Sequence, residues 1–284
     1  MSAVRWSTSR LLLLGGAFGV ACLVTACGDG HPYGGRGDGS SIVFGISQKI
    51  DGGKVVETRA GYEFLELANY KGGWETQVVY DGKSTCIFER LEKRIGKPRV
   101  ESGAASFSGG ALPSDGVAIP ANSEDIVQTD VTGWKTDDFL FFEATGFAMP
   151  RVPPQRMTAP AAELQITAPP ADGELSIRAN EDFSFSWGVP DEKFPSRVMI
   201  AIETEEPDGR SGEVRCFYNA EDVDGVVPKL WLTRLASSVP AEQPIKGKVQ
   251  IATHRQLTLY ARGGWTIYVV ATTLHREQPF TMPR

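Results

Sequence analysis

The stretch Asp182-Phe183-Ser184-Phe185-Ser186-Trp187 alternates aromatic and hydroxyl side chains. In an extended chain the aromatic residues fall on one face and the serines on the other, because successive side chains of a strand point in opposite directions. The pattern predicts a strand with one face in a hydrophobic core. Such a strand needs a second layer of structure to cover its apolar face, so the stretch favours two packed sheets.

The same period continues around this stretch, from about residue 162 to the end of the chain. Short alternating runs separated by Gly, Pro and Asp are typical of an antiparallel, immunoglobulin-like (Ig-like) β-sandwich. Pro228 favours a helix start, which predicts a helix over 229–236. We expect strands at 164–167, 174–177, 182–187, 197–203, 212–218, 248–253, 256–261 and 265–272.

A second block, 41–148, is less regular. Its segment 85–91 fits either a strand or the start of a short helix, because Glu, Arg and Lys favour helices. The Pro-rich stretch 149–161 favours an extended, semi-rigid chain and makes the best domain boundary. The sequence thus predicts a mainly β protein of two antiparallel β-sandwich blocks, 41–148 and 162–284. Strands of the first block are expected at 42–47, 54–57, 62–67, 75–80, 85–91, 104–108 and 139–144.

The N-terminus has the layout of a secretory signal peptide. Arg5 and Arg10 precede an apolar core at 11–24, and small residues follow. A basic start, a core of about 7–15 apolar residues and a small-residue cleavage zone are typical of an export signal. The core is shorter than the roughly 20 residues of a bilayer-spanning helix. We therefore expect residues 1–26 to be removed.

The end of this signal, Val24-Thr25-Ala26-Cys27, resembles the lipobox of bacterial lipoproteins. The resemblance implies cleavage before Cys27, a diacylglyceryl thioether on its sulfur, and an acyl group such as palmitate on the new amino terminus. Cys22 fits less well, because Gly19 stands where the aliphatic residue belongs. The alternative is an ordinary signal peptide cleaved after Ala26. In lipoproteins an Asp after the Cys directs retention in the inner membrane, so Gly28 favours the outer membrane.

Residues 27–40 are Gly-rich, polar and without apolar periodicity, which predicts a flexible tether. A chain of about 13 residues spans roughly 20 Å on average. Loss of residues 1–26 removes two arginines and changes the formal charge from −6 to −8. An acidic body is not attracted to an anionic bilayer, so the lipid would have to hold it there. The acidic balance also argues against nucleic acid as a partner.

The second half of the chain resembles a group of uncharacterised secreted bacterial β-sandwich lipoproteins. The resemblance rests on 146–169, with its Gly-x-x-x-Pro and Ala-Pro-Ala motifs, and on Phe185-Ser186-Trp187, Cys216-Phe217-Tyr218 and Val227-Pro228. It implies fold and location only. No catalytic or binding residue is carried over by it.

Arrangements of residues typical of catalytic sites are mostly missing, and histidine is scarce, although carboxylates are plentiful. Beyond the tether, His254 and His275 are the only histidines, and neither belongs to a metal-binding or nucleophile–base motif. We expect His254 at the surface end of a strand, and no metal or cofactor site. Acidic clusters at 203–206 and 221–225 leave a paired-carboxylate glycosidase open. For 221–225 a solvated loop is favoured over a calcium site, because Val223 interrupts the acids.

Cys86 and Cys216 would remain after lipidation, both in predicted strands and in an oxidising compartment. They form either a disulfide joining the two blocks or two buried thiols. We favour the thiols, because each cysteine would lie in the core of its own block. Trp74 and Trp134 follow glycines, so they could form an exposed platform for sugar rings. Packing inside the protein is the favoured interpretation for these and the other tryptophans.

These observations support two hypotheses about function. The favoured one is a lipid-anchored envelope protein, held at the membrane by its N-terminal lipid, that binds a protein or glycan or acts as a structural spacer without catalysis. The alternative is a lipid-anchored hydrolase of envelope polysaccharide that uses two carboxylates.

Overall fold

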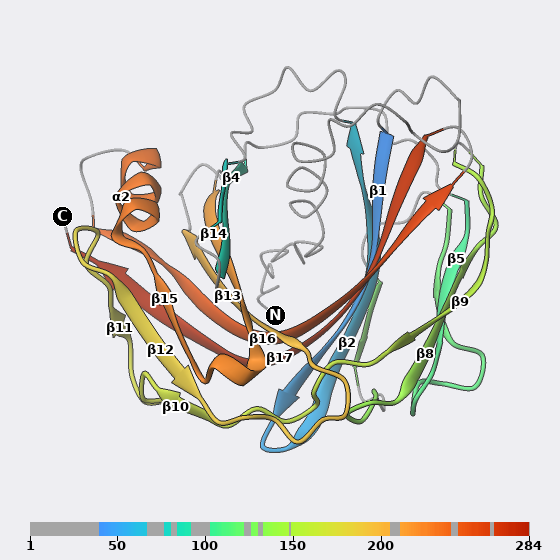
Figure 1. The fold of residues 1–284 in the computed structure, drawn as a ribbon, viewed down its shortest axis with the longest axis horizontal. Helices are drawn as coiled ribbons and strands as arrows, with labels where there is room; N and C mark the ends of the chain where they lie inside the picture. The colour runs from blue at the N-terminus through green and yellow to red at the C-terminus, as the bar shows by residue number, and fades with distance from the viewer. Residues whose placement is uncertain are drawn as a thin grey trace, which may run out of the picture.

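The computed structural model describes residues 40–66, 77–80, 84–91, 103–121, 126–129, 133–147, 149–204, 211–239, 244–261 and 264–283. Within them a large curved sheet carries two smaller sheets on one of its faces (Figure 1). The prediction of a mainly β protein with antiparallel sheets packed face to face is confirmed. The finer comparison with immunoglobulin-like sandwiches stays a prediction.

Nine strands of the described chain form the large sheet in the order β3-β4-β14-β13-β16-β17-β1-β2-β7, and β11 adds to β17. All neighbouring pairs are antiparallel except two. The pairs β1–β17 and β11–β17 are parallel. We call it the ten-stranded sheet. Its strands are β1 (Ser40–Asp51), β2 (Lys54–Glu66), β3 (Gln77–Tyr80), β4 (Ser84–Leu91), β7 (Ile126–Thr129), β11 (Leu175–Ser176), β13 (Arg197–Thr204), β14 (Ser211–Asn219), β16 (Ile245–Ala261) and β17 (Trp265–Met282).

The hairpin of β16 and β17 runs through the whole sheet (Figure 1). Its strands have 17 and 18 residues, which corresponds to a contour of nearly 60 Å at about 3.3 Å per residue. Apolar residues recur on the same face along both strands, so one hairpin contributes to two separate cores. A register shift between Ile251 and Ala252 marks a β-bulge between the two halves.

The first core lies under a four-stranded sheet of order β6-β5-β8-β9. Phe142 is its centre, with ring centroids 4.8 Å from Phe44 of β1 and 5.1 Å from Phe107. The alternation of buried and exposed residues along β8 places Phe142 inward. The strands of this sheet are β5 (Ala105–Gly109), β6 (Val117–Ile119), β8 (Phe139–Ala144) and β9 (Val152–Thr158).

The second core lies under a three-stranded sheet of order β10-β12-β15 and helix α2. The alternation that opened the sequence analysis is confirmed, because Phe185 and Trp187 are buried and stack at 5.5 Å between ring centroids. Helix α2 follows Pro228 as predicted and buries Trp231 in the same core. The elements are β10 (Ile166–Ala168), β12 (Phe183–Trp187), β15 (Asp224–Val227) and α2 (Lys229–Ser238).

Strands from the two expected blocks share the ten-stranded sheet. β4 lies beside β14, and β1 lies beside β17. The Pro-rich stretch 149–161, expected to separate two domains, instead contains β9, which pairs with β8. Segment 85–91 is a strand and not a helix. Among the described strands, β9 lies at the edge of the four-stranded sheet. Proline is tolerated there because one side of an edge strand needs no hydrogen-bond partner.

The two faces of the ten-stranded sheet differ. The face under both small sheets, which we call the covered face, carries Ile200 and Ile202 of β13 and Cys216 of β14 in the second core. The opposite face, which we call the charged face, carries the intervening residues, such as Glu203 of β13 and Arg215 of β14, together with a smaller apolar cluster that includes Met199 and Phe217. Period-two geometry alone separates the two sets.

Candidate functional site

The predicted lipidation residue, Cys27, lies outside the described residues, so its modification stays a prediction. The other two candidate residues, Cys86 and Cys216, are joined by a disulfide. They are direct partners in the antiparallel register of β4 and β14, with Cα atoms 4.1 Å apart. Side chains of directly opposed residues approach most closely where the pair is not hydrogen-bonded, which suits a bridge between neighbouring strands.

The preference for two unpaired thiols was therefore wrong. It assigned Cys86 and Cys216 to separate cores, whereas both lie in the second core, under the three-stranded sheet. The sequence separation of 130 residues means that the bond fastens an early strand to a late one. Local periodicity could place each cysteine in a strand, but it could not say that the two strands are neighbours.

Charged side chains form a row across the charged face. Lys49 Nζ lies 3.4 Å from Oε1 of Glu277, and Lys248 Nζ lies 3.7 Å from its Oε2. Lys248 Nζ also lies 3.4 Å from Oε2 of Glu203. Glu203 is opposite Glu213 in the register of β13 and β14. We call the following residues the ionic ladder: Lys49, Glu277, Lys248, Glu203, Glu213 and Arg215.

The ladder becomes more buried from β1 to β14. The side chain of Lys49 is 39% exposed, whereas those of Glu213 and Arg215 are 2% exposed. Arg215 donates from Nε and Nη2 to the two oxygens of Glu213, each at 2.6 Å. A paired guanidinium and carboxylate satisfy most of each other's hydrogen-bonding capacity, which is what allows both charges to be buried.

Glu203 has the most perturbed carboxyl group of the ladder. Burial, followed by the nearby Glu213 carboxylate, raises the pKa of Glu203 to about 7, and Lys248 and Arg215 oppose the shift. The same ladder lowers the pKa of Glu277, since hydrogen bonding from Gln250 and the charges of Lys248 and Lys49 outweigh burial. Two carboxyl groups on one face are thus shifted in opposite directions.

A raised carboxyl pKa beside a second carboxylate is the electrostatic arrangement of a general acid in a glycosidase. That reaction also needs a second carboxylate that can reach substrate or water. Both oxygens of Glu213 are instead held by Arg215, and the pair is buried. The geometry therefore favours a structural ion-pair network over a pair of catalytic acids.

Sequence reasoning named Glu203 within the acidic cluster 203–206 but missed its partners. The sequence did hold a sign of these partners. Glu213 and Arg215 alternate along the strand with apolar Val214 and Cys216, so both charges fall on the same face. A hairpin joining 197–204 to 211–219 brings Glu213 opposite Glu203. Lys248 comes from β16, which lies beside β13 only in the folded sheet, and Glu277 comes from β17 on the far side of β16, so no local pattern points to either residue.

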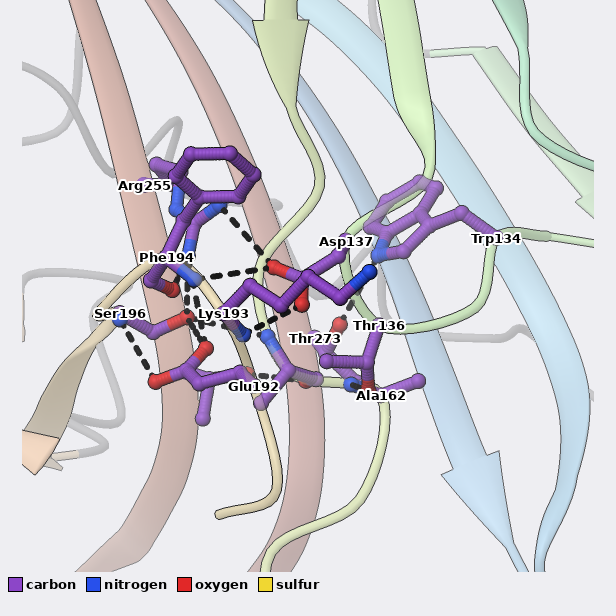
Figure 2. A network of polar contacts seen from close by, with 12 residues as sticks. Trp134, Thr136, Asp137, Ala162, Glu192, Lys193, Phe194, Ser196, Arg255 and Thr273 are labelled. Atoms are coloured by element: carbon purple, nitrogen blue, oxygen red, sulfur yellow. Dashed lines mark hydrogen bonds and ion pairs between the residues drawn. The ribbon is translucent and has the colours of Figure 1, made fainter.

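A second polar cluster lies at the middle of β16, around Arg255 (Figure 2). Arg255 Nη2 donates to the carbonyl oxygen of Phe194 and to Ser196 Oγ. The guanidinium also lies 3.4 Å from Glu192 and 3.9 Å from Asp137. Burial lowers the pKa of Arg255, and the two carboxylates oppose that shift. The cluster fastens the loop before β8 and the loop before β13 to one long strand, which is a structural role.

His254 lies inside β16 and is buried, so the prediction of a surface residue at a strand end was wrong. The two short strands predicted around it are one continuous strand. Burial, Arg197 and Arg215 together lower the pKa of His254 to about 3. Burial also lowers the pKa of His275 to about 3. In the part of the chain that the structure describes, no group of three or more His, Cys, Asp or Glu could hold a metal ion.

The remaining sequence candidates lie apart from the ladder. The acidic run 221–225 begins in a short 3₁₀ turn (Ala220–Asp222) and continues into β15. Trp134 is buried and donates its indole N–H to Thr273, so internal packing is confirmed for this residue. Trp74 lies outside the described residues.

Comparison with models of protein families finds no match for this chain, and comparison with curated proteins finds none either. Among the described helices, none has the length and apolar character needed to cross a membrane.

Proposed function

We propose that this protein is a lipid-anchored protein of the cell envelope with a non-enzymatic binding or structural role. The observation that carries the proposal is the disulfide between Cys86 and Cys216, buried in the second core. Structural disulfides form and persist in oxidising compartments outside the cytosol. This supports the export that the signal-like N-terminus and the lipobox-like Val24-Thr25-Ala26-Cys27 suggest.

The lipid on Cys27 would supply the membrane attachment. One acyl chain binds a bilayer only marginally, and each buried methylene adds about 0.8 kcal/mol, so two or three chains hold a protein effectively permanently. A body of formal charge −8 gains nothing from anionic lipids, which leaves the acyl chains as the source of affinity. Gly28 in place of Asp supports the outer membrane as the destination.

The body suits a passive role because the charges of the ionic ladder are engaged with one another. The ionic ladder pairs three cations with three carboxyl groups, two of the pairs between strands and the Arg215–Glu213 pair within β14. The long hairpin of β16 and β17 ties both cores into one sheet, and the disulfide fastens a further strand to it. Such a body can present a protein or glycan ligand surface, or hold other components at a distance.

The anchor is tested by a Cys27→Ser variant compared with the wild type after cell fractionation. We expect the wild type in the membrane fraction, with acyl chains on Cys27 by mass spectrometry, and the variant in the soluble fraction. Cys22→Ser is the matched control and should behave as the wild type. Membrane attachment of Cys27→Ser that resists salt and carbonate would contradict the proposal.

Glu203 favours one alternative, the hydrolase of envelope polysaccharide, because its pKa of about 7 suits proton donation. The two functions are separated by incubating the wild type and Glu203→Gln with envelope polysaccharide and measuring new reducing ends. A passive protein releases none in either form. Release by the wild type that Glu203→Gln abolishes would establish the alternative.

A further inference from the structure

One end of the ten-stranded sheet is where the chain enters the folded body. In the register of the sheet, Ser41 of β1 lies beside Thr266 of β17, and Thr266 lies beside Tyr260 of β16. The start of β1 and the turn between β16 and β17 are therefore neighbours, and Figure 1 shows them at the same end. We call this the tether end, because residues 27–40 would connect it to Cys27.

The loop between β8 and β9 lies at the same end. At the far end of the four-stranded sheet, Gly110 lies against Trp134, which hydrogen-bonds with Gln48 near the close of β1. The opposite end of that sheet, where the backbones of Gly103 and Gly146 meet, is consequently directed toward the beginning of β1. Phe147 follows Gly146 at this end and is exposed.

The tether end carries two highly exposed aromatic side chains. Phe147 is 75% exposed and Tyr260 is 69% exposed, the two largest values among the exposed large hydrophobic residues of the described chain. Trp265 lies in the same turn region, half-buried against the first core. Packing inside the protein explains neither Phe147 nor Tyr260. Both extend from the body at the place where a membrane anchor would be attached.

We propose that the tether end rests on the bilayer that holds Cys27, with Phe147 and Tyr260 at the boundary between the lipid headgroups and the acyl chains. The inference builds on the proposed lipid anchor. A tether of about 13 residues spans roughly 20 Å on average, so it keeps this end within reach of the headgroups. Aromatic rings partition into that boundary, and Tyr suits it best because its hydroxyl can stay hydrated. The net charge of the body opposes attraction to anionic lipid, so the contact rests on aromatic burial and tolerates salt.

The contact is tested with the lipidated full-length mature protein in vesicles of phosphatidylethanolamine and phosphatidylglycerol that contain brominated phosphatidylcholine. Tryptophan is introduced in turn by Tyr260→Trp, Phe147→Trp and, as the matched control, Val189→Trp. Val189 is 63% exposed but follows β12, in the layer over the second core. Fluorescence of the wild type is subtracted from each variant.

Brominated acyl chains quench tryptophan only on contact. We expect the added fluorescence of Tyr260→Trp and Phe147→Trp to fall about twofold or more, and that of Val189→Trp to be unchanged. Acrylamide quenches tryptophan from the aqueous phase. It should therefore quench Val189→Trp most, and Tyr260→Trp and Phe147→Trp least. Because all three positions are exposed, the substitutions should leave folding intact, which the retained Cys86–Cys216 bond checks.

The outcomes separate the two proposals. Mass spectrometry of the N-terminal peptide that contains Cys27 comes first. An unmodified Cys27 overturns the proposal of a lipid anchor. A lipidated Cys27 with no quenching at Tyr260→Trp or Phe147→Trp overturns the membrane contact alone, since the body then stands clear of the bilayer. Quenching of Val189→Trp to the same extent also overturns it, because the body then has no preferred orientation.

Discussion

The covered face and the charged face of the ten-stranded sheet use the same strands, but apolar packing dominates the first, whereas the second combines buried charges with a smaller apolar cluster. On the covered face, apolar residues such as Ile200 pack under the small sheets, and the Cys86–Cys216 bond adds a covalent link. On the charged face, Glu203 and His254 have pKa values shifted to about 7 and about 3. The difference teaches that apolar burial, as around Ile200, is insensitive to pH, whereas the burial of titratable groups such as Glu203 and His254 couples stability to pH.

The covered face should lose most when its disulfide is removed. We expect the double variant Cys86→Ala/Cys216→Ala to lose about 5 kcal/mol of unfolding free energy, because a bond across 130 residues restrains the unfolded chain strongly. Urea unfolding of the variant and of the wild type, with and without reductant, measures the effect. Equal midpoints for reduced and oxidised wild type, or two alkylatable thiols in unreduced protein, would show that the bond contributes nothing.

The charged face should lose nearly as much when one member of its buried pair is removed. Arg215→Met leaves the Glu213 carboxylate buried without its main partner, which costs about 3–5 kcal/mol. The double variant Glu213→Leu/Arg215→Met should recover most of that loss. Lys49→Met, at the exposed end of the ladder, is the control and should change stability by about 0.5 kcal/mol or less. A loss as large for Lys49→Met would mean that burial does not set the energetics.

The buried histidine makes the charged face sensitive to acid. The unfolded chain takes up a proton at His254 near pH 6.5, whereas the folded chain does so only near pH 3. Stability from this group is therefore complete above pH 6.5 and is lost as the pH falls toward 3. At pH 4 we expect His254→Gln to reduce the acid-induced loss by on the order of 2–3 kcal/mol. Thermal unfolding between pH 7 and pH 4 tests this, and parallel curves for the two proteins would refute it.

Glu203 should give a smaller effect of opposite sign. Its folded pKa of about 7 lies above the ordinary value of 4.5, so proton uptake stabilises the fold as the pH falls from 7 to 4.5. Glu203→Gln should remove this gain, a change of roughly 1–2 kcal/mol across that range. Glu277→Gln is the control, because the lowered pKa of Glu277 predicts a change in the other direction. The same sign for both variants would contradict the opposed shifts.

Local pattern predicted the strands well where alternation is strong. The runs 182–187, 197–203 and 212–218 coincide closely with β12, β13 and β14, and Pro228 marked the start of α2. Strands without an apolar run were missed, among them β9, whose two prolines suggested a linker. His254 was misjudged because a polar pair in the middle of a strand looks like a strand end until its neighbours across the sheet are known.

The candidate site was harder to predict than the fold. Glu203 stood out as part of an acidic cluster, but its pKa depends on Glu213 and Lys248, which lie on other strands. It also depends on burial, which the whole fold determines. The disulfide remained one of two options for the same reason. A cysteine in a predicted strand gives no indication of which strand lies beside it.

The amino-acid sequence alone determined the period of each strand, the start of the helix and the expectation of export, because these follow from backbone geometry and from short contiguous motifs. Only the tertiary structure decided that β4 lies against β14, that two cores share one hairpin, and that the ionic ladder assembles on one face. Side-chain direction is a local property of the peptide chain. The choice of neighbouring strand depends on contacts summed over the whole molecule, and no short segment contains that sum.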